Sequence, residues 1–295
     1  VLGARVVGQP NAIAELVSAV RVARSGLRSP KRPRGVFLFA GGSGVGKTEL
    51  ARALADELFP EGDALIKLDM SEYADRFTGS RLLGAPPGYQ GHGEEGQLTG
   101  PLRGRPYAVV LLDEFEKAHP DVQTMFLSLF DDGTITDAEG RRVDAREAFF
   151  IMTSNVGSEL AMKSKLGFGS GAAELDQSVL LDQVKKHFRP ELLNRVDEVV
   201  PFRMLDSDNL VDIVELHLQA LRGRAQERGI TLSWTRDVVQ ACVHHPKDTG
   251  YGARPALRAI DDLVAEPLGH HLLSSDALGS RHLQAVLRDG EVVFE

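Results

Sequence analysis

A glycine-rich loop between an apolar run and an amphipathic run constrains this chain more than any other feature. The pattern G-x-x-x-x-G-K-[ST] is matched by Gly41-Gly42-Ser43-Gly44-Val45-Gly46-Lys47-Thr48, which follows the apolar residues 36–40. Glycines let the backbone turn closely around phosphate oxygens, and the helix expected at 48–58 adds the positive end of its dipole. A chain of this composition matches the pattern by accident with a probability of about one per cent. The sequence therefore predicts a nucleotide site, with Lys47 at the β- and γ-phosphates and Thr48 on Mg²⁺.

Short β-rich runs separated by helical patterns lie on both sides of this loop. The runs cover residues 36–40, 64–68, 108–112, 149–153 and 198–202. Helical patterns cover 10–24, 48–58, 122–130 and 175–188. Strands this short and apolar, spaced by helices, favour an α/β fold with a parallel sheet covered by helices on both faces.

The pattern changes near residue 203. Longer helical patterns follow at 207–228 and 255–273, with a shorter one at 236–244. Asp289-Gly290 separates the apolar runs 283–287 and 292–294, which is typical of a β-hairpin. We predict two domains, an α/β nucleotide-binding domain at 1–203 and a small, mostly helical domain with a hairpin at 204–295.

Two carboxylates follow the apolar run at 108–112. They are Asp113 and Glu114, and the carboxyl ends of parallel strands open onto the ligand crevice of such sheets. Asp113 is expected in the Mg²⁺ shell, and Glu114 is expected to polarise an attacking water. An acidic pair alone could instead complement a helix N-terminus. Together with the upstream phosphate loop, it favours hydrolysis over phosphoryl transfer to a small molecule.

Composition argues against several other classes. Acidic residues outnumber basic ones 42 to 34, so the net charge of -8 predicts neither a nucleic-acid nor a membrane partner. The single cysteine, Cys242, cannot form an internal disulfide, which fits a cytoplasmic protein. No apolar run is long enough to span a bilayer. Because the sequence begins without Met or a signal sequence, we interpret it as part of a longer chain.

Further motifs occur in a fixed order along the chain. Besides the phosphate loop, they are Val7-Gly8-Gln9, Asp69-Met70-Ser71-Glu72-Tyr73, Gly84-Ala85-Pro86-Pro87-Gly88-Tyr89, Leu111-Leu112-Asp113-Glu114 through Lys117-Ala118-His119-Pro120, Met152-Thr153-Ser154-Asn155, Phe188-Arg189-Pro190-Glu191 through Asn194-Arg195, and Gly250-Tyr251-Gly252-Ala253-Arg254-Pro255. In these motifs the chain resembles, nearly from end to end, the second ATPase module of the Clp/Hsp100 family of the AAA+ superfamily. The resemblance implies a P-loop fold with a large α/β domain and a small lid domain, and it implies ATP and Mg²⁺ as ligands.

The resemblance also implies roles for individual residues. Asn155 corresponds to the sensor-1 residue that orients the attacking water, and Arg195 to the arginine finger that reaches the γ-phosphate of a neighbouring subunit. Arg254 corresponds to the sensor-2 arginine of the lid. Val6 and Val7 correspond to the segment beside adenine, with Ile213 added from the small domain. The implied nucleotide-binding set also includes Gly42, Ser43, Gly44, Val45, Gly46, Lys47, Thr48, Glu49 and Asp113.

Tyr89 matches the family's substrate-gripping position. It lies in a run rich in Gly and Pro that suits neither a helix nor a strand core. An aromatic residue in such an exposed loop is well placed to touch a partner. The resemblance therefore implies a homo-hexamer whose axial pore carries Tyr89 and pulls on unfolded or tagged protein substrates. Residues 132–141 are a second pore-loop candidate, and we expect a surface turn there.

The member of the family is indicated by a tripeptide. Leu166-Gly167-Phe168 resembles the anchor by which some members dock on a ClpP-type peptidase, and the run around it is most similar to the ClpC/ClpA type. A stand-alone disaggregase of the ClpB type remains an alternative. A nucleic-acid motor or clamp loader on the same ATPase core is an alternative from another class, against which the acidic charge and the Tyr89 loop argue.

Overall fold

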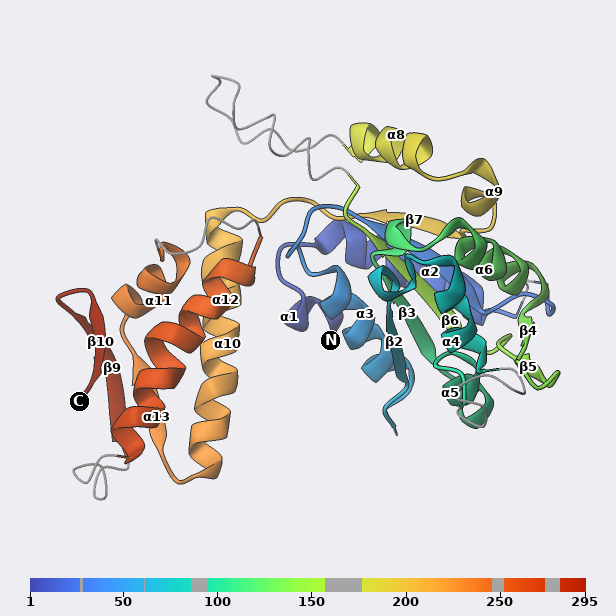
Figure 1. Ribbon diagram of the computed structural model, residues 1–295. Helices are drawn as coiled ribbons and strands as arrows, with labels where there is room; N and C mark the ends of the chain where they lie inside the picture. The colour runs from blue at the N-terminus through green and yellow to red at the C-terminus, as the bar shows by residue number, and fades with distance from the viewer. Residues whose placement is uncertain (27–28, 61, 86–94, 157–176, 246–251, 274–281) are drawn as a thin grey trace. The chain divides into compact units, whose positions relative to one another are not determined.

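A computed structural model describes residues 1–26, 29–60, 62–85, 95–156, 177–245, 252–273 and 282–295 (Figure 1). These residues form two compact units. One unit consists of Val1–Gly42 with Gly46–Arg203, and the other of Met204–Glu295 with Ser43–Val45.

A five-stranded parallel sheet forms the centre of the larger unit. Its order is β2-β3-β6-β1-β7, and every neighbouring pair is parallel. The strands are β1 (Gly35–Ala40), β2 (Leu65–Asp69), β3 (Val109–Asp113), β6 (Phe149–Ser154) and β7 (Glu198–Pro201). The predicted parallel sheet is confirmed, and each strand lies within one residue of its expected bounds. Because the strands are parallel, their carboxyl ends lie at one edge of the sheet.

Both faces of the sheet are buried. One face packs Leu38, Phe150 and Met152 into a core cluster with Phe126 and Phe130 of α6 (Pro120–Asp132). On the other side of the sheet, α3 (Lys47–Leu58) contacts β3 and β6 (Figure 1). Each fully buried Leu or Phe contributes about 1.5–3 kcal/mol through removal of its surface from water. This two-sided burial explains why the strands are nearly continuous apolar runs.

Local signals explain where the helices of the larger unit begin. Three helices have Pro in their first turn, where the missing N–H costs nothing. The His119 side chain also caps α6 by accepting a hydrogen bond from the Asp121 N–H at 3.1 Å. The remaining helices are α1 (Leu2–Arg5), α2 (Pro10–Arg24), α4 (Gly79–Leu83), α5 (Thr99–Gly104), α8 (Gln177–His187) and α9 (Pro190–Leu193), with 3₁₀ turns at Met70–Tyr73, Arg76–Thr78 and Phe115–Lys117.

The expectation of a surface turn over 132–141 is wrong in part. Asp132 ends α6, and β4 (Thr134–Thr136) pairs with β5 (Arg142–Asp144) as an antiparallel hairpin. The strands are only three residues long, so their alternation is too short to stand out in the sequence. Within the connecting turn, the Asp137 side chain is buried, with 6% of the residue exposed.

The smaller unit combines helices with a three-stranded sheet. Its core lies between α10 (Ser207–Glu227), α11 (Arg236–Val243), α12 (Arg254–Ile260), α13 (Glu266–Leu273) and the sheet β10-β9-β8. The predicted hairpin is present as β9 (His282–Arg288) and β10 (Glu291–Phe294), and Asp289 and Gly290 both have positive φ, as a type I′ turn requires. The sequence analysis missed β8 (Thr231–Trp234), which pairs with β9 in parallel.

The single helix expected at 255–273 is interrupted. A π-helical turn, Asp261–Ala265, separates α12 from α13. Pro267 has no N–H to donate to the carbonyl four residues earlier, and its ring crowds that carbonyl. The Glu266 N–H donates instead to the Asp261 carbonyl, five residues earlier, which widens the turn.

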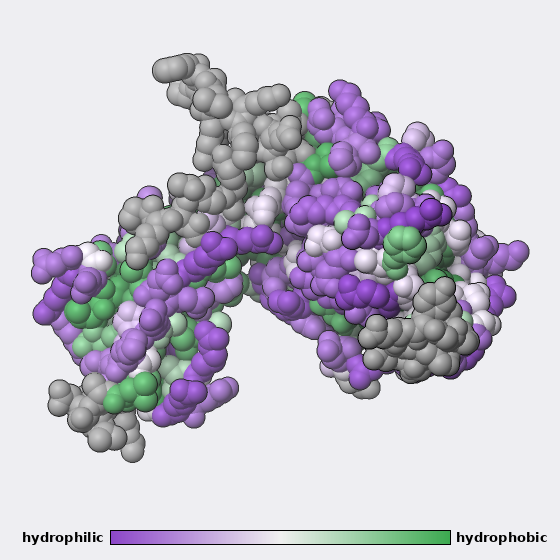
Figure 2. Space-filling model, in the orientation of Figure 1, coloured by the Kyte–Doolittle hydropathy of each residue, from purple (hydrophilic) through white to green (hydrophobic). Residues whose placement is uncertain are grey.

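Hydrophilic residues cover most of the visible face of the larger unit (Figure 2). The large apolar side chains that are exposed are scattered along the described sequence: Val1, Val22, Phe77, Tyr107, Val179 and Leu273. Among the described residues, no helix is both long enough and apolar enough to span a membrane.

Burial of Cys242 generates a prediction about thiol chemistry. Cys242 on α11 is fully buried, and burial raises the pKa of its thiol to about 11. At pH 8 the native protein should hold about 100-fold less thiolate than the unfolded chain, so a disulfide reagent should label it slowly until urea is added. Equal labelling rates in the native and urea-unfolded protein would contradict this burial.

The same shift has a consequence for stability. Above pH 9 the unfolded chain loses the thiol proton before the native protein does, so the free energy of unfolding should fall between pH 9 and about 11. Urea unfolding of the wild type against Cys242→Ala isolates this contribution, because the variant lacks the titrating group.

Candidate nucleotide site

The phosphate loop joins β1 to α3, and its backbone depends on glycine. Gly41, Gly44 and Gly46 have φ values of 152°, 73° and 103°, which L side chains rarely adopt. A Cβ on Gly41 would also lie 2.7 Å from the Phe202 carbonyl oxygen. The loop leads into a twelve-residue helix whose first N–H groups have no partner within the helix. This cradle fits an anionic phosphate group.

Lys47 is almost buried at the start of α3, with 7% of the residue exposed. Its ammonium donates to the carbonyl oxygens of Gly41 at 2.7 Å and Gly42 at 2.6 Å, and to the side-chain oxygen of Asn155 at 3.0 Å. A buried cation requires such acceptors, because an isolated charge away from water is costly. The contacts hold the ammonium at the loop.

Asp113 ends β3 and is tied to the neighbouring strand. The Thr153 hydroxyl donates to Asp113 Oδ1 at 2.6 Å and accepts from the Glu114 N–H at 3.0 Å. Lys67 forms an ion pair with Asp113 Oδ2 at 3.1 Å. The register brings these groups together: Leu112 of β3 pairs with Met152 of β6, so the residues that follow them, Asp113 and Thr153, are neighbours. One buried hydroxyl therefore positions both acidic residues.

Glu114 turns the chain sharply at the end of β3. It is one of two described non-glycine residues with positive φ, at 56°, a conformation that costs roughly 1–2 kcal/mol. Its carboxylate accepts from the Asn155 side-chain amide at 2.9 Å and forms an ion pair with Lys117. The hydrogen bond from Lys117 to the Glu114 carboxylate, together with the negative charge of that carboxylate, raises the pKa of Lys117, which stays cationic. Strained backbone of this kind is found at functional sites.

Asn155 connects the two halves of the site. Its side-chain oxygen accepts from Lys47 while its side-chain nitrogen donates to Glu114, so one amide spans the phosphate loop and the acidic strand end. Its own N–H donates to Glu116 Oε1 at 2.9 Å, which fixes the backbone beyond β6. The structure therefore brings together Lys47, Asp113, Glu114 and Asn155 from three strand ends.

Sequence reasoning missed four residues around this group: Lys67, Thr153, Glu116 and Lys117. Thr153 and Asn155 are two residues apart at the end of one strand, and Glu116 and Lys117 lie two and three residues after Glu114. The available signal was the set of polar residues at the ends of adjacent strands. It could not be used until the order of the strands was known.

The predicted adenine segment lies beside the loop. A Cβ on Gly46 would be 3.4 Å from Val6 Cγ1, and Val6 is buried. Arg5 joins α1 to α3 through ion pairs with Glu49 and Asp56. Glu49 thus has a structural partner in addition to its predicted role.

The predicted arginine finger is held by partners on α6 and α9. The Arg195 guanidinium pairs with Asp131 at 2.6 Å and donates to the Glu191 carbonyl oxygen at 2.6 Å. Arg32 donates to the Arg195 carbonyl oxygen at 2.7 Å. The Arg195 side chain is 28% exposed, so it is fixed in place and still partly accessible.

The remaining predicted residues fall elsewhere. Arg254 begins α12 and is exposed, and Ile213 lies buried on α10, both in the smaller unit. Tyr89 lies outside the described residues, as do Leu166, Gly167 and Phe168.

The donor set suits Mg²⁺ bound together with a nucleotide. Thr48 and Asp113 offer oxygen ligands, which Mg²⁺ prefers, and protein sites of this kind supply one or two ligands beside the phosphates. Within the described ranges, no group of three or more His, Cys, Asp and Glu side chains could hold a metal ion by itself.

Thr153 gives a test of this geometry. Thr153→Val keeps the shape but leaves an Asp113 oxygen and the Glu114 N–H without their partner, which should lower the free energy of unfolding by about 1–3 kcal/mol. We also expect weaker binding of ATP in the presence of Mg²⁺. Urea unfolding and ATP titration with and without Mg²⁺ measure the two effects. Thr153→Ser keeps the hydroxyl and is the control; a Val variant that matches Ser in both assays would refute the arrangement.

Comparisons with known proteins agree over most of the chain. A family model described as "AAA domain (Cdc48 subfamily)" matches residues 32–199, and one described as "C-terminal, D2-small domain, of ClpB protein" matches residues 205–286. Chaperone protein ClpB from Oceanobacillus iheyensis is 47% identical over 92% of this chain and 34% of its own length.

Two relatives are ATP-binding subunits of Clp proteases. ClpE from Bacillus subtilis is 44% identical over 98% of this chain and 41% of its own length. ClpC from Staphylococcus saprophyticus is 45% identical over 95% of this chain and 35% of its own length. The chain thus spans only 34% to 41% of the length of these relatives. With the P-loop geometry and the parallel sheet described above, these matches show that the chain is an AAA+ ATPase module that belongs to the Clp/Hsp100 family, in which it corresponds to the C-terminal nucleotide-binding module.

Proposed function

We propose that this module hydrolyses ATP in a homo-hexamer and uses the energy to unfold protein substrates and thread them through an axial pore toward a ClpP-type peptidase. The observation that carries the proposal is the Asn155 amide, which contacts both Lys47 and Glu114. Through these two contacts the Lys47 ammonium and the Glu114 carboxylate lie at one edge of the sheet, which supports the hydrolysis of a phosphoanhydride there.

The residues divide the chemistry between them. Lys47 and the loop N–H groups would hold the β- and γ-phosphates, with Lys47 exchanging carbonyl contacts for phosphate oxygens. Glu114 would take a proton from water as the water oxygen attacks the γ-phosphorus and the bond to the β,γ-bridging oxygen breaks. Asn155 would orient that water through its contact with Glu114. Mg²⁺, held by Thr48 and Asp113, supplies neutralising charge when bound.

We propose a ring because the Arg195 guanidinium could serve the nucleotide site of a neighbouring subunit. Arg195 pairs with Asp131 at the end of α6 and is still partly exposed, which suits delivery to a neighbour's site. A guanidinium that reaches the γ-phosphate neutralises charge in the transition state and raises the rate by orders of magnitude. Because the chain spans less than half of its relatives, assembly is proposed for the whole protein.

We assign residues 1–203 to the nucleotide-binding domain and residues 204–295 to the lid. Val6 and Val7 would contact adenine, with Ile213 from the lid, and Arg254 would couple the lid to the nucleotide. The lid's own packed core supports movement as a unit. The free, buried Cys242 supports a cytoplasmic location.

The second candidate is a stand-alone disaggregase. The match of residues 205–286 to a ClpB small domain and the ClpB relative favour it. The tripeptide Leu166-Gly167-Phe168 favours peptidase docking instead. Both candidates use the same ATP chemistry and pore, so they differ only in where the polypeptide goes.

Mixing two inactive variants tests the shared site. Glu114→Gln should bind ATP but hydrolyse it at least about 100-fold more slowly, because the base is lost. Arg195→Ala should also hydrolyse ATP slowly, because each nucleotide site then lacks the arginine finger of the neighbouring subunit. When subunits of both variants mix at random, about a quarter of the sites pair an intact Glu114 with a neighbour's Arg195. We therefore expect ATP hydrolysis to return on mixing.

The control for this experiment is Glu57→Gln, an exposed residue on α3 that should leave the rate unchanged. Mixed subunits that stay as slow as each variant alone would show that Arg195 does not act across an interface. Normal turnover in Glu114→Gln would remove that residue from the mechanism.

Two further variants separate gripping from docking. Tyr89→Ala should keep ATP hydrolysis and lose translocation of an unfolded polypeptide, while Tyr89→Phe keeps the ring and most of the activity. Phe168→Ala should keep translocation and lose only degradation by an added ClpP-type peptidase. Fluorescence of a tagged substrate reports unfolding and release of its peptides reports degradation. If Phe168→Ala changes neither, the disaggregase is favoured.

A further inference from the structure

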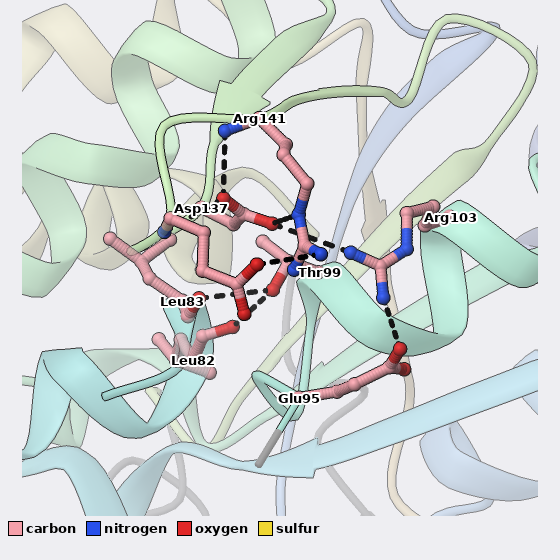
Figure 3. Close-up of polar contacts among 8 residues, drawn as sticks. Leu82, Leu83, Glu95, Thr99, Arg103, Asp137 and Arg141 are labelled. Carbon is pink, nitrogen blue, oxygen red and sulfur yellow. Dashed lines mark hydrogen bonds and ion pairs between the residues drawn. The ribbon is translucent and has the colours of Figure 1, made fainter. Parts of the chain in front are cut away.

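Asp137 is a buried carboxylate that has no role in the proposed ATP chemistry. Only 6% of the residue is exposed, and it lies in the turn between β4 and β5. Its Oδ1 accepts from the N–H groups of Glu139 at 3.0 Å and Arg141 at 2.8 Å. Its Oδ2 accepts from Arg141 Nε at 2.7 Å and from Arg103 at 3.4 Å. The carboxylate therefore lies between two guanidinium groups (Figure 3).

This carboxylate stays charged despite its burial. Burial raises the pKa of Asp137, but the hydrogen bonds from the Arg141 side chain and from the Arg141 and Glu139 N–H groups outweigh it and hold the pKa below its usual range. A buried charge that loses one of its partners is strongly destabilised. The cluster should therefore form or break as a whole.

Arg103 extends the cluster to a different segment. It lies on α5 and pairs with Glu95 as well as with Asp137 (Figure 3). Glu95 forms an antiparallel bridge with Gly84, so this pair of residues joins the two described ends on either side of residues 86–94. Tyr89 lies between those ends in the sequence.

Backbone contacts join the same parts. The Ala138 N–H, in the β4–β5 turn, donates to the Leu83 carbonyl oxygen at 3.1 Å. The Thr99 hydroxyl of α5 contacts the carbonyl oxygens of Leu82 and Leu83 at 3.4 and 3.3 Å (Figure 3). At Gly96, a Cβ would lie 2.3 Å from the Leu82 carbonyl oxygen, so the segments approach too closely for any side chain.

We propose that Asp137, Arg103 and Glu95 form a joint that positions the 137–141 turn and the ends of the Tyr89-bearing segment as one unit. The proposal rests on the proposed function and deepens it, since it makes Asp137 a positioning residue for the substrate polypeptide. Two separate loops then act on the polypeptide together. An alternative in which Asp137 only stabilises its own turn requires neither Arg103 nor Glu95.

Amide hydrogen exchange tests the joint without any substrate. Asp137→Asn should speed exchange about tenfold or more at the Gln97 and Leu98 N–H groups, which donate to carbonyl oxygens of the 81–82 segment. Arg103→Gln and Glu95→Gln should do the same at Ala138 and Arg141. Faster exchange that is confined to the segment carrying the substitution would overturn the proposal.

Two references make this result interpretable. Asp144→Asn removes the same charge from the same hairpin, but Asp144 pairs with the exposed Arg146 and not with Arg103, so Gln97 and Leu98 should keep their rates. The Phe149 N–H, which donates to the Ala108 carbonyl, reports whether the sheet remains folded. If a variant also speeds exchange at the Phe149 N–H, its sheet has lost stability and its result is not used. Glu95→Gln then takes its place, because the Glu95 side chain is exposed.

Polypeptide-stimulated ATP hydrolysis gives the functional test. Asp137→Asn and Arg103→Gln should each raise the half-saturating polypeptide concentration about tenfold while the KM for ATP is unchanged. The double variant should be no worse than either single variant, because both break one joint. Additive effects, or an equal effect of Asp144→Asn, would overturn the proposal. If the wild type shows no stimulation at all, the proposed function fails, and hydrogen exchange alone decides on the joint.

Discussion

The parallel register of β1, β6 and β3 determines which side chains can meet at the carboxyl edge of the sheet. β6 lies between β1 and β3, so residues at the carboxyl end of β6 can reach the phosphate loop on one side and the acidic end of β3 on the other. Thr153 and Asn155 use this position: the first contacts Asp113, and the second contacts both Lys47 and Glu114. A slip of one residue in β6 would turn both side chains to the other face and separate the loop from the carboxylates.

The geometry at Glu114 shows how this edge is preorganised. Its left-handed backbone is unfavourable for a side chain, yet it is held by the Thr153 hydroxyl, while Asn155 and Lys117 hold the carboxylate. Groups fixed before the reaction need no reorganisation during it, which is the main advantage of such sites. Lys47 is fixed in the same way by three oxygen acceptors.

The sequence allowed the five strands of the parallel sheet, the β9–β10 hairpin, most helices and the phosphate loop to be predicted, because apolar runs, glycines and helix starts are local signals. Thr153 and Glu116 could not be recognised, because their importance depends on the order of strands far apart in the chain. Asp137 was expected in a surface turn for a related reason. Asp and Gly are typical of turns whether or not the turn is buried, and the contact of Asp137 with Arg103 of a distant helix is not a local signal. The positions of Tyr89 and Phe168 stay predictions.

One continuous stretch of chain links the chemistry to the joint. Asp113 and Glu114 end β3, and Lys117 follows in the next turn, just before α6. α6 is thirteen residues and thus about 20 Å long, and Asp131 in its last turn holds Arg195. β4 then leads directly to Asp137. A helix that lies between the Glu114 turn on one side and the Asp131–Arg195 ion pair on the other is the kind of rigid element that coupling between sites needs. A neighbour's nucleotide that drew Arg195 away from Asp131 would act on the same end of α6 that carries the hairpin.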